Sequence, residues 1–432
     1  MKLKLQKYHL IIMSGWGSRI IMAATQLVAI PILLTNLGIK DYAIFSVLTG
    51  LNIWFALSCF GIGPSLQNRI SSLKVQKKNY HSYLTSITLF LLLFGIVQVA
   101  IFSIFSPFLQ RLLLKQFNYN GSSFTLFIIG SIYILNTVFE ISNKIFFAEQ
   151  RGYWVYLYNT LGRFFSLVSI IVVCSANIQR NKLLILIIAW VFPPMLFSLI
   201  GYLHAIPLSN WIKHAKISVF RELLFKSKDF ATITIAGTVI VGMDYIVISQ
   251  VLIPSDIVVY NIANKVFLLI SLGYSVILST LWPVLSEKFQ LGNIKSAHKL
   301  IYKNISYGSL LVVTIVLVFV FFRGAFIEYF KIEGDTLNIP CTIIFLFGAY
   351  YLIKVWTETF SITLQSRNQT KVLMYVLPLQ ACLNIIFMFT LGHYFKLNGI
   401  LFSLILCNLL TSAYMLPFAH YKSLKLITKS IR

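Results

Sequence analysis

Long apolar runs alternate with short polar segments along the entire chain. An α-helix needs about 20 predominantly apolar residues to cross a hydrocarbon core of about 30 Å at 1.5 Å per residue. Runs of this length predict transmembrane helices. The chain contains twelve of them, at residues 11–35, 42–62, 85–109, 124–143, 157–176, 183–205, 231–252, 257–284, 304–325, 340–360, 372–392 and 399–419.

The first two runs predict a transmembrane hairpin that turns between Leu37 and Asp41. Arg19 lies inside the first run, about eight residues from its cytoplasmic end and therefore about 12 Å deep. A charged residue at a helix centre costs roughly 2.5 to 3.5 kcal/mol on insertion. We therefore expect Arg19 to face protein or water, which implies a polar interior.

The 36 Lys and Arg residues are distributed unevenly between the two sides of the membrane. The N-terminus, the even-numbered loops and the C-terminus together carry 24 of them. The opposite loops carry 8, when Arg323 at the end of run 304–325 is counted with the loop that follows it, and the runs carry the other 4. Cytoplasmic loops are enriched in Lys and Arg. The distribution predicts a multi-pass protein of the cell inner membrane with both termini in the cytoplasm.

The longest cytoplasmic connection, residues 207–229, divides the chain into two halves of six runs each. We predict an all-α polytopic membrane protein with a six-helix lobe at 1–206, a linker at 207–229 and a second six-helix lobe at 230–432. Parallel repeats of this kind place a substrate path between the lobes, so we expect a central cationic cavity there. The linker is either a helix along the headgroups or a solvated connection.

Composition excludes several classes of protein. The chain is 58% apolar and 11% charged, whereas a soluble globular domain carries about 25% charged residues. Its net charge of +24 comes from cations in short loops, which do not form the basic face of a nucleic-acid-binding module. The sequence has no motif typical of a hydrolase, a nucleotide-binding site or a metal site, and its five cysteines are dispersed through the runs. We therefore expect neither an enzyme nor a metalloprotein.

Several short stretches resemble the Wzx-type O-antigen flippases of the polysaccharide transport family, in the superfamily that also contains multidrug and lipid II exporters. The similar stretches are Leu37-Gly38 to Asp41-Tyr42, Phe60-Gly-Ile-Gly63 with Gln67-Asn-Arg69, Phe147-Ala-Glu-Gln150 with Arg151-Gly152, and Val259-Tyr260-Asn-Ile-Ala-Asn-Lys265 to Leu281-Trp282-Pro283. The resemblance implies that an undecaprenyl-diphosphate-linked oligosaccharide is moved from the cytoplasmic to the periplasmic leaflet. It also implies membrane lipids, a polysaccharide polymerase and a chain-length regulator as partners.

Charged residues inside the runs are the candidate site residues, because they are costly in lipid. Asp244 and Lys265 lie at similar depth in adjacent runs and can meet, either as a structural ion pair or as a coupling residue and a phosphate ligand. Lys354 and Glu358 are spaced i,i+4, which favours local neutralisation. We predict that substrate binding involves four cations, namely Arg19, Arg163, Lys265 and Lys354. Arg19 and Arg163 have an alternative interpretation, which is that they snorkel to the surface.

Two other functions remain open at this stage. A multidrug exporter of the same superfamily would take cationic substrates, which an interior with four cations and three acids disfavours. A membrane O-antigen polymerase or sugar-lipid transferase usually needs a large periplasmic loop or an acidic catalytic cluster, and the sequence contains neither. No cofactor is expected, and coupling to H⁺ or Na⁺ stays open, with Asp244 and Glu358 as candidate coupling residues.

Overall fold

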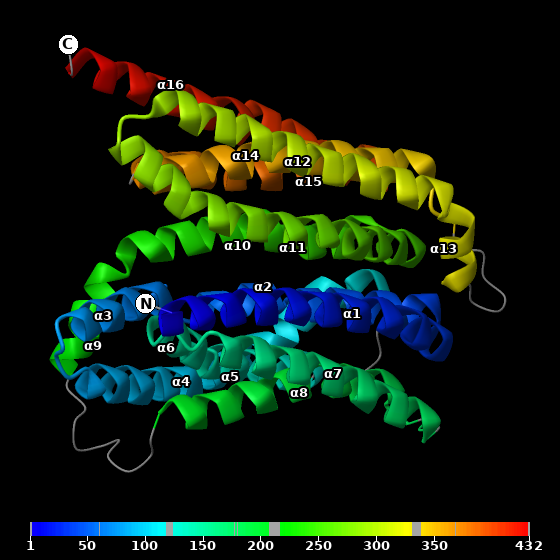
Figure 1. Ribbon diagram of the computed structural model, residues 1–432. Helices are drawn as coiled ribbons and strands as arrows, with labels where there is room; N and C mark the ends of the chain where they lie inside the picture. Colours follow the sequence, from blue (N-terminus) through cyan, green and yellow to red (C-terminus); the bar gives the residue numbers. More distant parts are fainter. Residues whose placement is uncertain are drawn as a thin grey trace. The chain divides into compact units, whose positions relative to one another are not determined.

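The computed structural model describes residues 2–59, 61–117, 124–176, 178, 180–206, 217–330, 338–367 and 369–430. All regular secondary structure in these residues is helical (Figure 1). The helices form two compact units, Met1–Thr238 (unit 1) and Val239–Arg432 (unit 2), whose boundary falls inside one helix, α10. The predicted division at 207–229 stays a prediction, and residues 207–216 of it lie outside the described residues.

Unit 1 contains the helices from α1 to the first part of α10. Their bounds are α1 Lys2–Gly50, α2 Asn52–Phe55, η1 Ala56–Cys59, α3 Ile62–Val75, α4 His81–Leu114, η2 Lys115–Phe117, α5 Phe124–Phe139, α6 Ile141–Ala148, α7 Tyr153–Ser175, α8 Lys182–Ala205, α9 Ile217–Lys226 and α10 Lys228–Val251. Unit 2 continues from α10 with α11 Pro254–Gln290, α12 Ile294–Phe321, α13 Arg323–Tyr329, α14 Cys341–Ser366, α15 Thr370–Leu410 and α16 Ser412–Ser430.

Ten helical segments among the described residues are long and apolar enough to cross a membrane. Two of them, Met13–Cys59 and Lys371–Leu424, span 47 and 54 residues, about twice the length that one crossing requires. Each contains a residue with non-helical backbone, Gly38 in the first and Lys396 in the second. The structure therefore confirms an all-α polytopic membrane protein, while the count of twelve crossings stays a prediction.

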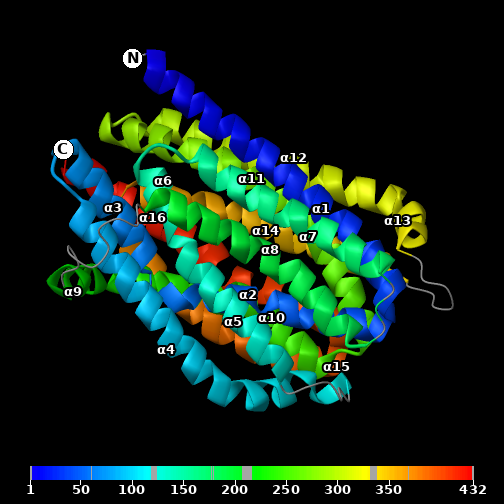
Figure 2. The same ribbon diagram turned by 90° about the horizontal axis from the view of Figure 1, so that it is seen from below.

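The backbone break at Gly38 lies in the turn that the sequence predicts for the first hairpin. Its φ of 73° is in the region that favours glycine, because a Cβ would clash there. Figure 2 shows α1 running away from the N-terminus and the chain returning toward α2.

Four predicted runs are not single helices: run 124–143 is interrupted at Glu140, run 304–325 at Phe322, and runs 42–62 and 399–419 as follows. Run 42–62 is interrupted after Gly50, continues through the short α2 and η1, and enters α3 after Gly61, whose φ is 67°. The last run, 399–419, is interrupted at Thr411 (φ −119°, ψ −94°), which separates α15 from α16. The hydrophobic pattern does not reveal these breaks, because apolar content identifies a crossing without identifying a break in its backbone.

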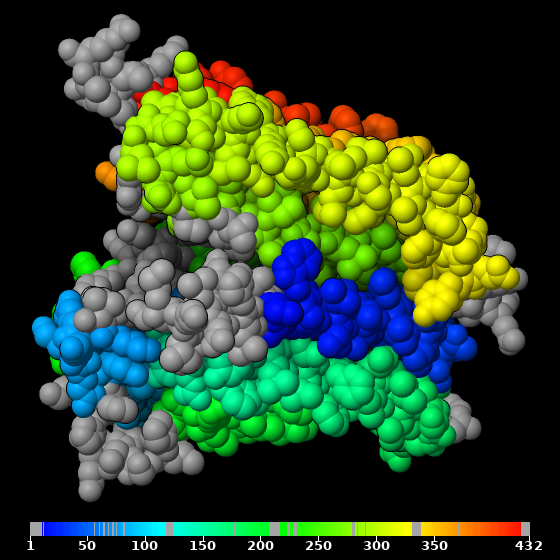
Figure 3. All heavy atoms as spheres, in the orientation of Figure 1, coloured from blue at the N-terminus to red at the C-terminus, as the bar shows by residue number. Residues whose placement is uncertain are grey.

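Small residues bring the helices of unit 1 together. A Cβ on Gly162 of α7 would lie 2.9 Å from the Pro194 Cα of α8, and one turn later the Ser166 hydroxyl donates to the Trp190 carbonyl at 2.8 Å. On the other side of α7, Ser18 of α1 donates to the Tyr156 carbonyl at 3.3 Å. Figure 3 shows α1 (blue) and α7 (teal) side by side on the surface of unit 1. Close backbone approach of this kind is a main source of helix association in lipid.

Residues 217–226 of the predicted linker form α9, which packs on α3 and α4. Phe220 is buried in the apolar cluster that these helices share, where its ring stacks on Phe90. Arg69 of α3 pairs with Glu222 of α9 at 3.4 Å, and the Tyr83 hydroxyl of α4 donates to the same carboxylate at 3.0 Å. These contacts attach α9 to unit 1.

Candidate functional site

A charged cavity of about 500 Å³ lies inside unit 1. Arg19 of α1 and Lys144 of α6 line it, together with Glu140, which occupies the break between α5 and α6. Its volume falls within the range of about 300 to 1,000 Å³ that is usual for ligand sites. Arg19 therefore faces a cavity inside the protein, as the cost of placing its charge in lipid predicts.

Two glycines that follow η1 contribute to the lining of this cavity. Gly61 and Gly63 are both lining residues, and a Cβ on Gly63 would lie 3.2 Å from the Lys144 Cγ. A larger residue at position 63 would therefore crowd the aliphatic part of the Lys144 side chain. The opposite wall is fixed by the contact of α1 with α7, where Thr160 donates to Ser18 at 2.7 Å, one residue before Arg19.

A second, smaller cavity of about 200 Å³ adjoins the first, since Glu140 and Asn159 line both. Arg163 lies here with its guanidinium 5.2 Å from the centre of the Trp190 ring, a cation–π distance. The Asn136 amide donates to the Glu140 carboxylate at 2.9 Å. The charged residues that line the two cavities are three cations and one carboxylate: Arg19, Lys144, Arg163 and Glu140.

Amide and hydroxyl side chains make up much of the remaining polar lining. They are Asn52, Tyr133, Asn136, Thr137, Asn143, Tyr156, Asn159, Ser198 and Thr234. Side chains that both donate and accept are suited to the hydroxyl groups of sugars. Analysis of charges alone missed them, although asparagines inside predicted transmembrane runs are a detectable signal. The cavities can therefore hold an anion beside a polyhydroxylated group.

Unit 2 contains a separate group of partly buried charges and tyrosines. The Tyr260 hydroxyl of α11 donates to Asp244 Oδ2 of α10 at 2.5 Å, and Asp244 Oδ1 is buried without a hydrogen-bond partner among the described residues. Lys354 of α14 pairs with Glu358 at 3.9 Å and lies 5.1 Å from the centre of the Tyr351 ring. Lys354 also acts electrostatically on Asp244.

Lys354 thus joins Asp244 and Glu358 into one group. From the sequence alone, Asp244 and Glu358 belong to two independent pairs. Lys265 lies on α11 and is partly buried, and its pairing with Asp244 stays a prediction. Tyr260 was missed as a site residue, because tyrosine is common in apolar runs and carries no charge. Within the described residues, no group of three or more His, Cys, Asp or Glu could hold a metal ion.

Comparison with curated proteins shows relatives along nearly the whole chain. A Salmonella typhi protein described as an O-antigen transporter is 31% identical over 429 residues, which are 97% of this chain and 97% of the relative. A Yersinia pseudotuberculosis protein described as an O-antigen export protein is 30% identical over 431 residues, 98% of each chain. No family model matches the sequence.

Solved structures with the same fold include two transporters. An inward-facing multidrug resistance MATE family transporter of the MOP superfamily has a TM-score of 0.74 at 12% identity, over 94% of this chain and 95% of its own. The lipid II flippase MurJ, in an inward closed conformation, has a TM-score of 0.69 at 15% identity, over 95% of this chain and 87% of its own. At these identities the similarity concerns the fold.

Proposed function

Since the chain belongs to the O-antigen transporter family, we propose that it moves an undecaprenyl-diphosphate-linked oligosaccharide unit from the cytoplasmic to the periplasmic leaflet. Transport proceeds by alternating access and involves no covalent chemistry, so the protein is not an enzyme. This proposal rests on the two adjoining cavities of unit 1. Their lining combines three cations, Arg19, Lys144 and Arg163, with a group of asparagines. The cations attract the diphosphate, and the amides hydrogen-bond to the sugars.

Deletion of the gene provides the test. We expect lipid-linked repeat units to accumulate on the cytoplasmic side and long surface polysaccharide to disappear, while assembly of the unit continues. Re-expression of the chain should reverse both effects. Loss of unit assembly would instead indicate a transferase, and a change confined to drug sensitivity would indicate a multidrug exporter.

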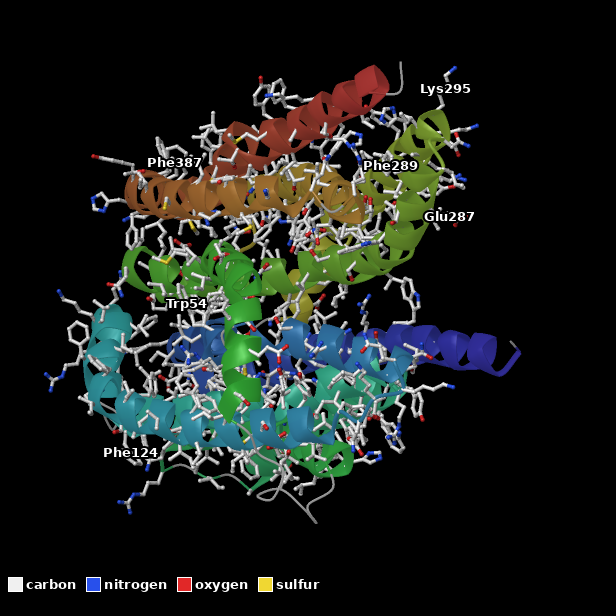
Figure 4. The ribbon with its side chains drawn as sticks, turned by 90° about the vertical axis from the view of Figure 1, so that its left-hand side faces the viewer. Trp54, Phe124, Glu287, Phe289, Lys295 and Phe387 are labelled. Carbon is white, nitrogen blue, oxygen red and sulfur yellow. The ribbon has the colours of Figure 1, made fainter. Side chains whose placement is uncertain are left out.

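We propose that the protein lies in the inner membrane of the cell and that both of its termini are in the cytoplasm. Segments predicted to be cytoplasmic meet within each unit, which supports placing them on one side of the membrane, and the distribution of Lys and Arg assigns that side. In unit 1, Lys74 donates to the Glu149 carbonyl at 3.1 Å. In unit 2, Arg367 donates to Ser423 at 2.9 Å, and Figure 4 shows Glu287, Phe289 and Lys295 together near one end, away from Phe387.

Reporter fusions test this orientation. A reporter joined after Lys78 should be active in the cytoplasm, and one joined after Arg180 should be active in the periplasm, because three predicted crossings separate the two positions. A fusion after Lys295 should again be cytoplasmic. If the fusions after Lys78 and Arg180 reported the same side, the assignment of crossings in unit 1 would be wrong.

We propose that transport is coupled to H⁺ or Na⁺ through the Asp244 group of unit 2. The buried Asp244 Oδ1 and Glu358, the ion-pair partner of Lys354, offer oxygen ligands or proton acceptors inside transmembrane segments, where such groups usually serve transport. Initial rates in proteoliposomes with imposed H⁺ or Na⁺ gradients measure the coupling. The polysaccharide polymerase and the chain-length regulator remain proposed partners, which co-purification would detect.

A further inference from the structure

An apolar groove of about 420 Å³ lies in unit 1 beside the charged cavity. Its walls come from α2, η1, α4, α5 and the first turns of α10. Trp54, labelled in Figure 4, lies in the wall next to α10. Three phenylalanines complete the aromatic part of the lining, namely Phe55, Phe102 and Phe105.

Contacts between rings and a glycine give this groove a defined wall. The Phe55 ring contacts Phe102 edge to face, with 5.5 Å between the ring centres. A Cβ on Gly130 of α5 would lie 2.1 Å from the Phe102 Cε1, so only glycine lets this ring lie against α5. At the base of the groove, the Gln98 amide donates to the Ser58 carbonyl at 3.1 Å and joins α4 to η1.

The groove opens on the side of the unit that carries exposed apolar residues. Ile101, Phe105 and Ile235 line it and are 51%, 55% and 47% exposed. Exposed apolar side chains on a transmembrane helix face lipid, because water would not tolerate so large a patch. Ile101 also lies near the middle of the predicted run 85–109. A hydrocarbon chain can therefore enter the groove sideways from within the bilayer.

The groove and the charged cavity adjoin each other at Thr234, which lines both. Consecutive residues of η1 also separate them, since Ser58 lines the groove and Cys59 lines the cavity. Together with the smaller Arg163 cavity, they make a series that is apolar at one end, cationic in the middle and rich in amides at the other end. This order matches a molecule with a hydrocarbon chain, an anionic link and a sugar.

We propose that the groove binds the isoprenoid chain of the lipid-linked substrate next to its diphosphate. The inference rests on the proposed function and extends it by assigning a site to the tail. A phospholipid fits less well, because its two acyl chains hold its phosphate at the bilayer surface, whereas a single chain can follow its headgroup into the protein. The aromatic walls also offer broad faces to the methyl branches of an isoprenoid.

The test fills the groove without touching the charged cavity. Ala231 of α10 lines the groove, and Ala231→Phe places a ring in it. Undecaprenyl diphosphate should bind the purified Ala231→Phe protein at least ten-fold more weakly than the wild type, whereas inorganic diphosphate should bind both equally. Ala100→Phe is the matched control, because Ala100 is exposed on α4 and does not line the groove; both ligands should bind it as they bind the wild type.

Photo-crosslinking of the wild-type protein in nanodiscs keeps the test valid if Ala231→Phe folds poorly. A polyprenyl diphosphate with a diazirine on its chain should label the peptide that contains Ile101 and Phe105, and undecaprenyl diphosphate should compete where excess phosphatidylethanolamine does not. Labelling by a diazirine phospholipid alone would overturn the inference and leave an ordinary lipid contact. Equal binding of undecaprenyl diphosphate to wild type and Ala231→Phe would also overturn it. Neither result would affect the gene-deletion phenotype, which tests the proposed function separately.

Discussion

Replacement of Arg19 by alanine should lower transport by about 10- to 100-fold. A charge-assisted hydrogen bond contributes about 1.5 to 3 kcal/mol, which corresponds to this range of affinity. The structure places Arg19 in the lining of the charged cavity that Glu140 and Asn159 also line, where a diphosphate can accept from its guanidinium. Flipping of a fluorescent lipid-linked oligosaccharide in proteoliposomes measures the effect.

Membrane insertion should survive this change, because removal of a charge from an apolar helix favours insertion. Arg19→Lys should recover only part of the transport, since an ammonium cannot present two parallel donors to a phosphate. Arg111→Ala serves as the matched control, because Arg111 is exposed in the last turn of α4 and lines neither cavity. Wild-type transport by Arg19→Ala at normal abundance would show that the cavity does not hold the diphosphate.

Replacement of Lys354 by methionine should lower the stability of the protein and abolish transport. It leaves Asp244 and Glu358 without the cation that acts on both. Loss of one partner of a buried ion pair costs about 3 to 5 kcal/mol. Because the side chains of Lys354 and Glu358 remain 25% and 35% exposed, we expect about half of that, roughly 2 kcal/mol. Thermal unfolding of the purified protein and its abundance in membranes measure the loss.

Removal of the carboxylates in the same protein separates a structural role from coupling. Asp244→Asn and Glu358→Gln, added to Lys354→Met, leave no uncompensated charge in the group, so abundance should return. If the group couples transport to an ion, the triple variant should still fail to respond to an imposed H⁺ or Na⁺ gradient. Full, gradient-dependent transport by the triple variant would rule out coupling through these residues. Normal stability of Lys354→Met alone would contradict the electrostatic role of the lysine.

The breaks in the helices show how far a hydrophobic pattern leads. The turn at Gly38 follows from the sequence, because a glycine stands between two runs that are each long enough to cross a membrane. The breaks after Gly50 and at Thr411 do not follow, because the apolar residues continue without a gap. In a protein interior, side chains and neighbouring helices can satisfy the freed backbone groups, so a break leaves little trace in hydropathy.

The sequence by itself determined the all-α membrane class, the location of most crossings and the presence of charges that need a protein interior. These properties depend on the free-energy cost of moving single residues into lipid. That cost is a property of each residue type and can be read from the sequence before the fold is known.

The tertiary structure alone decided which of these residues meet. It placed Arg19 in the same cavity as Glu140 and Asn159, which come from other helices. It also brought Tyr260 of α11 to Asp244 of the preceding helix. It also showed that an apolar groove adjoins the charged cavity at Thr234. Small residues and ring contacts between helices determine which helices pack together. The hydrophobic periodicity along one helix does not say which helix is its partner.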